Sequence, residues 1–485
     1  MVCEIKIVSD IKKLQDMKSK IFSLPMLVAV ILGVIVASCA KDHKLLDAIP
    51  STVQQAGTVR LKSALEQAGC KFENGVGTTP EGMQAPERLT NIVELVGKLD
   101  ASGSCDVNDV AWAVDAKGKF FMTMLVNDRA KFKEASSGNV EWTDETGGFA
   151  CGKVKAMTVL LDDERVWCTD ASASEAVGSV EALVKEAKES SLSAMTGLEQ
   201  ILGSDNLLNA VARQGTAKDK KGKKAAKGEN TELEAVWATV SCNVKDNKLV
   251  AGSSLMQADG TQVAFKGLTK VNPAVLAYVP ENFNVAFGLG VTPEFDWSIL
   301  TQFVGAVGGF QSQAMLSVVT PYLQSIDGTI FLAAGPANQE AYTDIDPGNW
   351  QFVMMVRLPQ QKINDIMGMV RSSLFMAGIS PRQAKDGLMI VPQYGMNLYM
   401  GNVDGYFAVS NIPFEPTRQN SLAPVFNGKE GALSIDIPTL RVFGPRMPEF
   451  GVNLQVQLSS DNTTAELGLN GSETPILQAI LKALV

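Results

Sequence analysis

The feature that most constrains this chain lies near its N-terminus, where a charge-free apolar run over residues 21–38 ends at Cys39. Lysines precede the run and small residues close it, which is the layout of a secretory signal. Residues 36–39 read Val-Ala-Ser-Cys, the order of a bacterial lipobox, whose cysteine is diacylated and becomes the mature N-terminus. The pattern therefore predicts a lipoprotein signal peptide over residues 1–38, lipidation at Cys39, and a tether over residues 39–47.

Two alternatives remain open for this leader. The run of 18 apolar or small residues is nearly long enough to span a bilayer, so it could be an uncleaved anchor. Translation could also start at Met17, which would give a signal of ordinary length. Ala40 and Lys41 follow the cysteine, in place of the aspartate that typically retains lipoproteins in the inner membrane. We expect a lipid-anchored protein of the bacterial outer membrane, facing either the periplasm or the cell surface.

Charge and length narrow the class of protein. The chain has 485 residues and a formal net charge of −9. Its first 38 residues hold five lysines and three acidic residues, so the mature chain is near −11. Nucleic-acid binding needs clustered Lys and Arg on the surface, so we expect no nucleic-acid partner. About 447 residues remain after residue 38, which is too long for one ordinary core and predicts at least two domains.

The only histidine of the chain, His43, falls within the predicted tether. A base on a mobile tether cannot be held within hydrogen-bonding distance of a reacting group, so Ser-His-Asp and Cys-His catalysis are excluded. His-ligated zinc and iron are excluded for the same reason. Five cysteines follow Cys39 and none form a CxxC motif; Cys151 and Cys168 could meet across neighbouring strands, although buried free thiols are commoner.

The second half of the chain repeats the element order of the first. In the first half, strand 120–126 is followed by helix 128–135; the counterpart in the second half is strand 350–358 followed by helix 361–374. A hairpin of strands 157–161 and 166–169 likewise corresponds to a hairpin of strands 396–400 and 406–410. Alternation such as Asn453-Leu454-Gln455-Val456 is typical of half-buried antiparallel strands.

We therefore predict an α+β fold with two tandem similar domains, each an antiparallel sheet with helices packed on one face. The first domain is expected over 48–270, with a Lys-rich loop at 217–230, and the second over 275–485. The Lys-rich loop could touch anionic lipid, but a solvated loop is the commoner outcome. A single large α+β domain with similar hairpins is the alternative.

Several motifs are candidate functional sites. The acidic run Asp162-Asp163-Glu164 falls at a predicted hairpin turn, where Asp bonds its own backbone. Residues 344–349 superficially resemble a calcium loop but lack the later bidentate glutamate. No Gly-rich phosphate loop follows a strand, and the glycines at 305–309 resemble a close-packed helix end. The Met-rich stretch 354–376 is either core filler or an adaptable apolar groove, and exposure distinguishes the two. We therefore predict no catalytic, cofactor-binding or metal-binding residues and no cofactor.

With the lipobox, the Ile49-Pro50 entry and the duplicated strand–helix order, the chain resembles the large uncharacterised lipoproteins of Bacteroidota, a domain-of-unknown-function family. The resemblance implies localisation and fold class and carries over no catalytic residue. The expected function is a non-catalytic binding or envelope-assembly protein, held at the membrane by its lipid anchor, with a glycan, another envelope protein or a lipid as ligand. The alternatives are a carboxylate-based hydrolase acting on polysaccharide, and a lipid or lipoprotein carrier, which needs a large apolar cavity.

Overall fold

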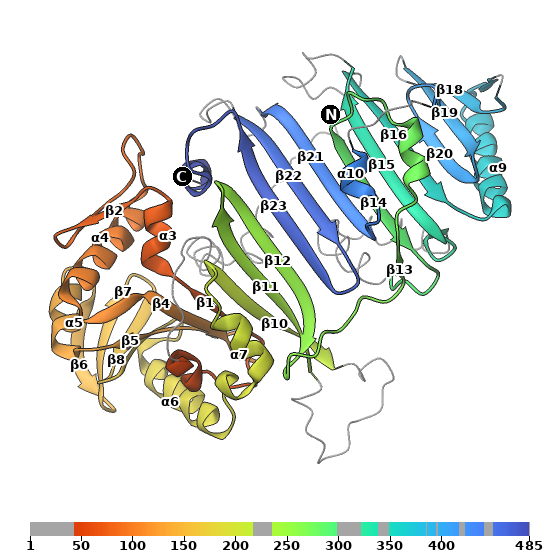
Figure 1. Ribbon diagram of the computed structural model, residues 1–485. Helices are drawn as coiled ribbons and strands as arrows, with labels where there is room; N and C mark the ends of the chain where they lie inside the picture. Colours follow the sequence, from red (N-terminus) through yellow and green to blue (C-terminus); the bar gives the residue numbers. More distant parts are fainter. Residues whose placement is uncertain are drawn as a thin grey trace, which may run out of the picture. The chain divides into compact units, whose positions relative to one another are not determined.

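The computed structural model of the chain describes residues 43–216, 235–297, 322–337, 349–384, 386–393, 396–416, 422–440 and 450–484. Within these ranges the protein is a mixed α+β structure with antiparallel sheet and helices, which confirms the predicted fold class (Figure 1). The chain divides into two compact units. Unit 1 contains the residues up to Val263 together with Thr474–Val485, and unit 2 contains Ala264–Glu473.

The main sheet of unit 1 is antiparallel throughout. Its strand order is β6-β7-β8-β9-β5-β4-β1-β10-β11-β12. The strands are β1 (Gln55–Val59), β4 (Cys105–Val114), β5 (Phe120–Val126), β6 (Glu141–Thr146), β7 (Phe149–Val154), β8 (Met157–Leu161), β9 (Arg165–Thr169), β10 (Leu208–Thr216), β11 (Ala235–Lys245) and β12 (Lys248–Gln257). A separate hairpin joins β2 (Lys71–Glu73) to β3 (Val76–Thr78).

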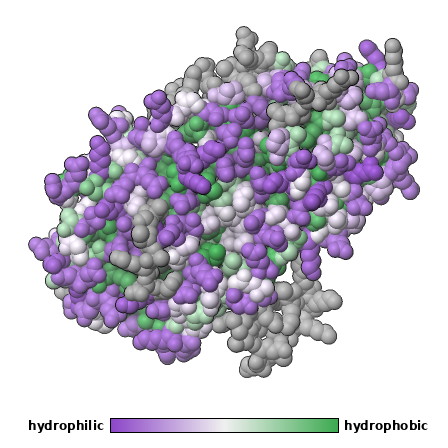
Figure 2. Space-filling view, in the orientation of Figure 1, coloured by the Kyte–Doolittle hydropathy of each residue, from purple (hydrophilic) through white to green (hydrophobic). Residues whose placement is uncertain are grey.

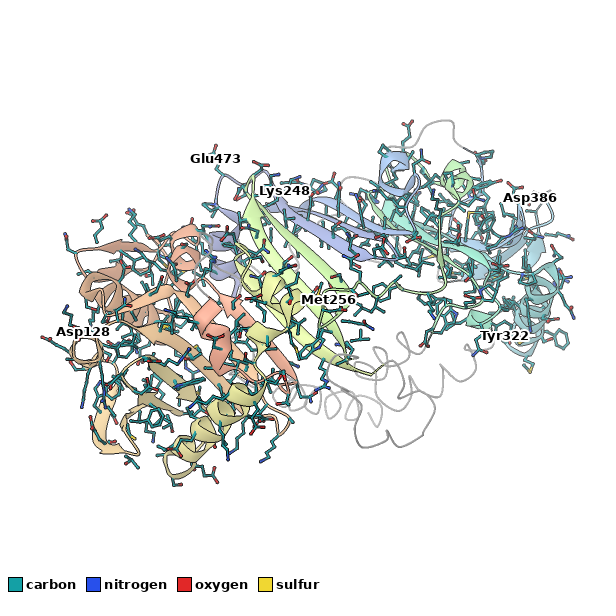
Figure 3. All side chains as sticks on the ribbon, turned by 60° about the horizontal axis from the view of Figure 1, so that its bottom comes forward. Asp128, Lys248, Met256, Tyr322, Asp386 and Glu473 are labelled. Atoms are coloured by element: carbon teal, nitrogen blue, oxygen red, sulfur yellow. The ribbon has the colours of Figure 1, made fainter. Side chains whose placement is uncertain are left out.

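The helices of unit 1 are η1 (His43–Ala48), α3 (Leu61–Gln67), α4 (Glu87–Ser102), α5 (Arg129–Ser136), α6 (Ala173–Glu189), η2 (Leu192–Ala194), α7 (Thr196–Leu202) and α11 (Ile476–Leu484). Local chemistry sets several of their ends. Asp128, at the N-terminal end of α5, accepts a hydrogen bond from the backbone N–H of Lys131 at 3.0 Å, which satisfies a donor that the helix leaves free (Figure 3). Gly103 ends α4 with a φ of +60°, a left-handed conformation that favours glycine.

One face of the unit 1 sheet is covered by α6. Trp167 lies directly opposite Thr123 and Leu160 in the neighbouring strands, so these residues share a face. Val180 and other buried residues of α6 pack in one cluster with Leu160 and Trp167. The apolar residues of α6 recur at helical spacing and thus bury one side of the helix.

The opposite face of the same sheet is covered by α5. Val159 precedes Leu160 on β8, so its side chain points to the opposite face of the sheet. Val159 lies opposite Gly152 on β7, and Gly152 lies opposite Trp142 on β6, so Trp142 is on this second face too. The Trp142 indole N–H donates to the Ser136 hydroxyl of α5 at 3.3 Å. Helices therefore pack on both faces, and the predicted one-sided arrangement is wrong. The reason is that a helix following a strand can return to either face, which strand alternation does not determine.

The strands of unit 2 are also antiparallel, with the order β17-β18-β19-β20-β16-β15-β14-β21-β22-β23. Its strands are β13 (Leu268–Thr269), β14 (Val285–Val291), β15 (Gly328–Pro336), β16 (Trp350–Arg357), β17 (Arg382–Gln383), β18 (Met389–Gln393), β19 (Met396–Val403), β20 (Tyr406–Ser410), β21 (Gly431–Leu440), β22 (Phe450–Leu458) and β23 (Asn462–Asn470). The short β13 pairs with the end of β14. The helices are η4 (Pro273–Tyr278), α9 (Gln360–Met376) and α10 (Ala423–Phe426).

The two faces of the unit 2 sheet are covered unequally. Residues of η4 and α10 pack with Phe331, Val353 and Ala408 on one face. On the other face, α9 packs through Ile363 against the end of the sheet near Val291, and through Met367, Val370 and Leu374 against Met389 and Met400. No helix among the described residues is long and apolar enough to cross a membrane.

The described structure differs from the expected boundaries in two places. η1 begins at His43 and its Leu46 is fully buried, so the fold starts before Ala48 and inside the predicted tether. The C-terminal helix α11 belongs to unit 1, although we placed it in the second domain, 275–485. Asn247 of the β11–β12 turn accepts a hydrogen bond from the backbone N–H of Ile476 at 2.8 Å. The signal peptide, the lipidation site Cys39 and the Lys-rich loop 217–230 lie outside the described residues.

Candidate functional site

The acidic run at 162–164 is a turn, as predicted, and not a catalytic pair. One carboxylate oxygen of Asp162 accepts backbone hydrogen bonds from Glu164 at 2.8 Å and from Arg165 at 2.7 Å. Asp163 forms an exposed ion pair with Arg129 at 3.2 Å. Asp162 therefore holds the β8–β9 turn and Asp163 links it to Arg129 of α5, which are structural roles.

Other acidic and Gly-rich candidates give no site. Most of the calcium-like loop 344–349 and all of the glycine cluster 305–309 lie outside the described residues. Within the part of the chain that the structure describes, no group of three or more His, Cys, Asp or Glu side chains is placed to hold a metal ion.

The cysteines are free wherever the structure describes them. Cys151 lies opposite Leu160, and Cys168 lies opposite Val159, so the two thiols point to opposite faces of the sheet. A disulfide between them would need both side chains on one side, so this arrangement excludes it. Burial raises the pKa of Cys168 to about 12, which disfavours the reactive thiolate.

The tryptophans and methionines separate into core and surface. Trp167 and Trp237 lie on strands and are fully buried. The Met-rich stretch divides: Met355 is fully buried, whereas Met369 is 48% exposed and Met376 is 80% exposed. Filling of the core therefore explains only part of the stretch.

A cleft of about 560 Å³ opens in unit 1 between α6, the β4–β5 turn and the residues that follow η1. Its polar groups are already engaged with one another. The Lys119 ammonium donates to the Ser179 hydroxyl at 3.2 Å, and Thr52 donates to the Glu186 carboxylate at 2.6 Å. Asp115 accepts two backbone hydrogen bonds within the turn. The cleft offers a place for a small polar ligand, but the described groups show no nucleophile–base pair.

The surface that folding does not explain lies on unit 2. Nine apolar side chains stand directly opposite one another across neighbouring strands and form one row on the α9 face of the sheet. This apolar row consists of Met389, Met400, Val409, Met354, Leu332, Phe287, Leu433, Val456 and Ala465.

α9 covers only one end of the apolar row, near Met389 and Met400. In the middle of the row, Leu332 is 45% exposed and Phe287 is 37% exposed. Figure 2 shows hydrophobic residues reaching the surface among hydrophilic ones. The other members of the row are half-buried or buried. Single exposed apolar side chains are commonplace, but Leu332 and Phe287 lie directly opposite each other, and a contiguous apolar patch marks a binding surface.

A second apolar feature is the end of α9. Its packed side carries Ile363, Met367, Val370 and Leu374. Met369 and Met376 lie seven residues apart, two turns along the helix, and project away from that packed side. Phe375 is 85% exposed. We call Met369, Phe375 and Met376 the α9 tip.

Tyr322 lies beside this helix (Figure 3). Its hydroxyl donates to the Met369 sulfur at 3.5 Å, and the Lys362 ammonium lies 5.6 Å from the centre of its ring. These contacts tether one side of Met369, while Phe375 and Met376 remain exposed to solvent.

Sequence reasoning did not single out Phe287, Leu332 or Phe375. β14 and β15 carry large or apolar residues at successive positions, such as Phe331-Leu332, and this pattern is typical of strands buried on both faces. Only the placement of α9 shows that one face is partly uncovered. The signal that was available is the Met-rich composition of α9, which left an apolar groove open as an alternative.

The chain matches no protein-family model and no curated protein. Among solved structures it is similar to crystal forms IV, III and I of the protein TP0453, with TM-scores of 0.26, 0.29 and 0.26 and 10–11% sequence identity. The matches cover 47–50% of this chain and 82–87% of the TP0453 chain. Because TM-scores this low establish neither fold nor function, the conclusions below rest on the residues of this chain alone.

Proposed function

We propose that this protein is a lipid-anchored lipoprotein of the bacterial outer membrane that acts by binding, without catalysis, and that its ligand presents an apolar group to unit 2. The observation that carries the proposal is the apolar row, whose central side chains Phe287 and Leu332 are left partly in water. The leader ending in the lipobox at residues 36–39 supports the anchor.

The use of the reactive groups supports binding over catalysis. Asp115, Asp128 and Asp162 each accept backbone hydrogen bonds at a turn or a helix end. Burial raises the pKa of Cys70 and Cys105 to about 12, so neither thiol is an activated nucleophile. Such groups stabilise the fold, whereas catalysis needs groups held free for the substrate.

We also propose that the two units are copies of one ancestral unit, each an antiparallel sheet with helices. The two sheet orders correspond strand for strand when β1 is matched with β14, β5 with β16 and β12 with β23. In both units a helix, α5 or α9, follows the matched strand β5 or β16. The same order of ten strands with the same helix position supports duplication.

The polysaccharide hydrolase remains the second candidate, and the cleft of unit 1 is where it would be sought. Its carboxylates at Asp115, Glu175 and Glu186 are the available groups. Asp115 and Glu186 already accept hydrogen bonds, and Glu175 lies 4.0 Å from Lys119. An acid–base pair flanking a glycosidic bond needs one carboxyl group kept protonated and free, so the cleft favours this function less than the apolar row favours binding.

The anchor is tested by Cys39→Ala in the producing bacterium. We expect the parent chain to fractionate with the outer membrane and to incorporate an acyl label, and the variant to lose both. A parent chain that stays in the membrane without incorporating the acyl label would show an uncleaved transmembrane leader in place of a lipid anchor.

The binding surface is tested with Nile red, an uncharged dye that fluoresces in apolar surroundings. We expect Leu332→Ser to lower the fluorescence of the bound dye. The matched control is Val240→Ser, because Val240 is also an aliphatic side chain on a sheet and is 39% exposed, but lies in unit 1. Equal fluorescence in both variants would contradict the assignment of the binding surface to unit 2.

A further inference from the structure

The α9 tip differs from the apolar row in shape and in charge. Phe375 and Met376 are 85% and 80% exposed at the end of a helix, so they protrude from unit 2, whereas the row lies flat on its sheet. The apolar side of a surface helix normally faces the core. The second half of α9 is apolar on its packed side, and it also carries the exposed Met369 and Met376 on its outer side, on either side of the exposed Ser372. Packing among the described residues does not require these two methionines to be apolar.

The charges near the α9 tip indicate what kind of partner it binds. From Ile366 to Gln383 the ionisable side chains are Arg371 and Arg382, both exposed. The next two are Lys385 and Asp386, and the first half of α9 adds Lys362 and the exposed Asp365. Four positive and two negative side chains give residues 362–386 a net charge of +2 in a chain whose net charge is −9. The Asp386 carboxylate accepts the backbone N–H of Leu388 at 3.1 Å, which engages one of the two negative groups.

From this combination we infer that the α9 tip inserts into the interface of an anionic lipid bilayer. Apolar side chains at the centre and arginines at the rim match the acyl region and the negative headgroups of such a bilayer. Arginine can keep its guanidinium at the headgroups while its stem lies in apolar surroundings. Flexible methionines also suit a disordered acyl layer.

A symmetric contact between two copies would bring their positive segments face to face, and an uncharged apolar protein segment would leave the local positive charge without a partner. The inference deepens the proposed function and rests on its placement of the protein at a membrane, because an anchored chain meets the bilayer at high effective concentration. It does not depend on how the leader is processed, since any membrane attachment presents the tip to lipid.

The test reconstitutes the full chain into vesicles and asks where position 375 lies. Phe375→Trp places an indole at the tip, and its exposure makes the substitution compatible with folding. Val76→Trp is the matched control, because Val76 is 60% exposed in unit 1. Quenching by lipids with brominated acyl chains is measured for each variant, and the signal of the six native tryptophans is subtracted with the parent chain.

We expect the Phe375→Trp indole to be quenched in vesicles containing phosphatidylglycerol and the Val76→Trp indole to remain unquenched. A basic residue near an anionic surface contributes about 1 kcal/mol, which is about fivefold in the inserted population. Arg371→Glu and Arg382→Glu should therefore each reduce the inserted fraction about fivefold or more, and vesicles of phosphatidylcholine alone should give weak quenching.

Two results would overturn the inference. One is Phe375→Trp quenching no greater than that of Val76→Trp. The other is an emission shift that grows with protein concentration and is insensitive to brominated lipid, which would make the tip an interface between copies. In either case the Nile red difference at Leu332 still tests the proposed function independently, so the two failures are distinguishable.

Discussion

The contact of Gly288 with two phenylalanine rings gives a sharp test of the unit 2 core. The rings of Phe331 on β15 and Phe426 on α10 meet edge to face, with centroids 5.4 Å apart. A Cβ atom added at Gly288 would lie 2.8 Å from two carbons of Phe426 and 3.3 Å from Phe331. Both rings are fully buried and cannot swing into solvent. We predict that Gly288→Ala destabilises unit 2 by about 1–3 kcal/mol through overpacking.

In a chain that lacks the Phe426 ring, the same Gly288→Ala change should stabilise unit 2 and no longer destabilise it. Phe426→Ala alone should cost about 3–5 kcal/mol, because it empties a buried aromatic site. In Gly288→Ala/Phe426→Ala the new methyl group enters space that the ring has vacated. The clash disappears, and alanine in a strand is favoured over glycine by about 0.5–1 kcal/mol. The double variant should therefore be more stable than the sum of the single changes predicts, by at least about 1 kcal/mol.

Hydrogen exchange measured by mass spectrometry suits this cycle, because a chain with two units need not unfold in one step. Peptides covering β14 and β15 report the opening free energy of unit 2 directly. Gly178→Ala is the control, since a Cβ at this position of α6 would meet nothing within 4 Å, and it should be neutral or stabilising. The described packing would be refuted if the free-energy changes of Gly288→Ala and Phe426→Ala added up to that of the double variant within about 0.5 kcal/mol. It would also be refuted if the Gly288→Ala chain were as stable as the parent.

Three further predictions concern ionisable groups. The backbone N–H of Lys131 lowers the pKa of Asp128 below its ordinary value of 3.8, so the stabilisation is present above that value and is lost as pH falls through the folded pKa. Asp128→Ala should speed amide exchange in the first turn of α5 at neutral pH, and Asp128→Asn, which keeps an acceptor, should do so less. A hydrogen bond to Asp404 raises the pKa of Tyr278 to about 12; the stabilisation is complete below the ordinary value of 10 and is lost as pH rises through 12. A phenolate absorbance difference between the parent and Tyr278→Phe that appears near pH 10 would contradict this. Three buried thiols with pKa values of about 11–12 should resist iodoacetamide at pH 8 in the native chain and react in denaturant: Cys70, Cys105 and Cys242. Prompt labelling of the native chain at these positions would contradict their burial.

The parts of the fold that the sequence predicts are those fixed by local chemistry. The hairpin of β8 and β9 is confirmed because Asp162 specifies its turn, and α5 is confirmed because Asp128 specifies its start. The face that each helix covers was predicted wrongly, since it depends on contacts between residues far apart in the chain. Trp142 meets α5 through a hydrogen bond that no periodicity encodes.

The candidate binding surface was only half predictable. Composition indicated an unusual number of methionines in and around α9, and their flexibility suggested an apolar groove. Which of them face water is decided by packing: Met355 lies beneath η4 and α10, whereas Met376 lies beyond the last contact of its helix. Exposure is a property of what covers a residue, and that information is spread over the whole unit.

The position of α11 has a consequence for biogenesis. Helix α11 belongs to unit 1, so unit 1 is interrupted by the whole of unit 2 and is completed by residues that are synthesised after it. Ile476 and Leu477 are buried there, and Ile476 is capped by Asn247, which emerges more than two hundred residues earlier. All segments of unit 2 are thus synthesised before those of unit 1 are complete. A nascent chain, or one clipped before residue 474, would carry an intact unit 2 and an unfinished unit 1 with exposed apolar side chains, which is the state that chaperones and proteases act on.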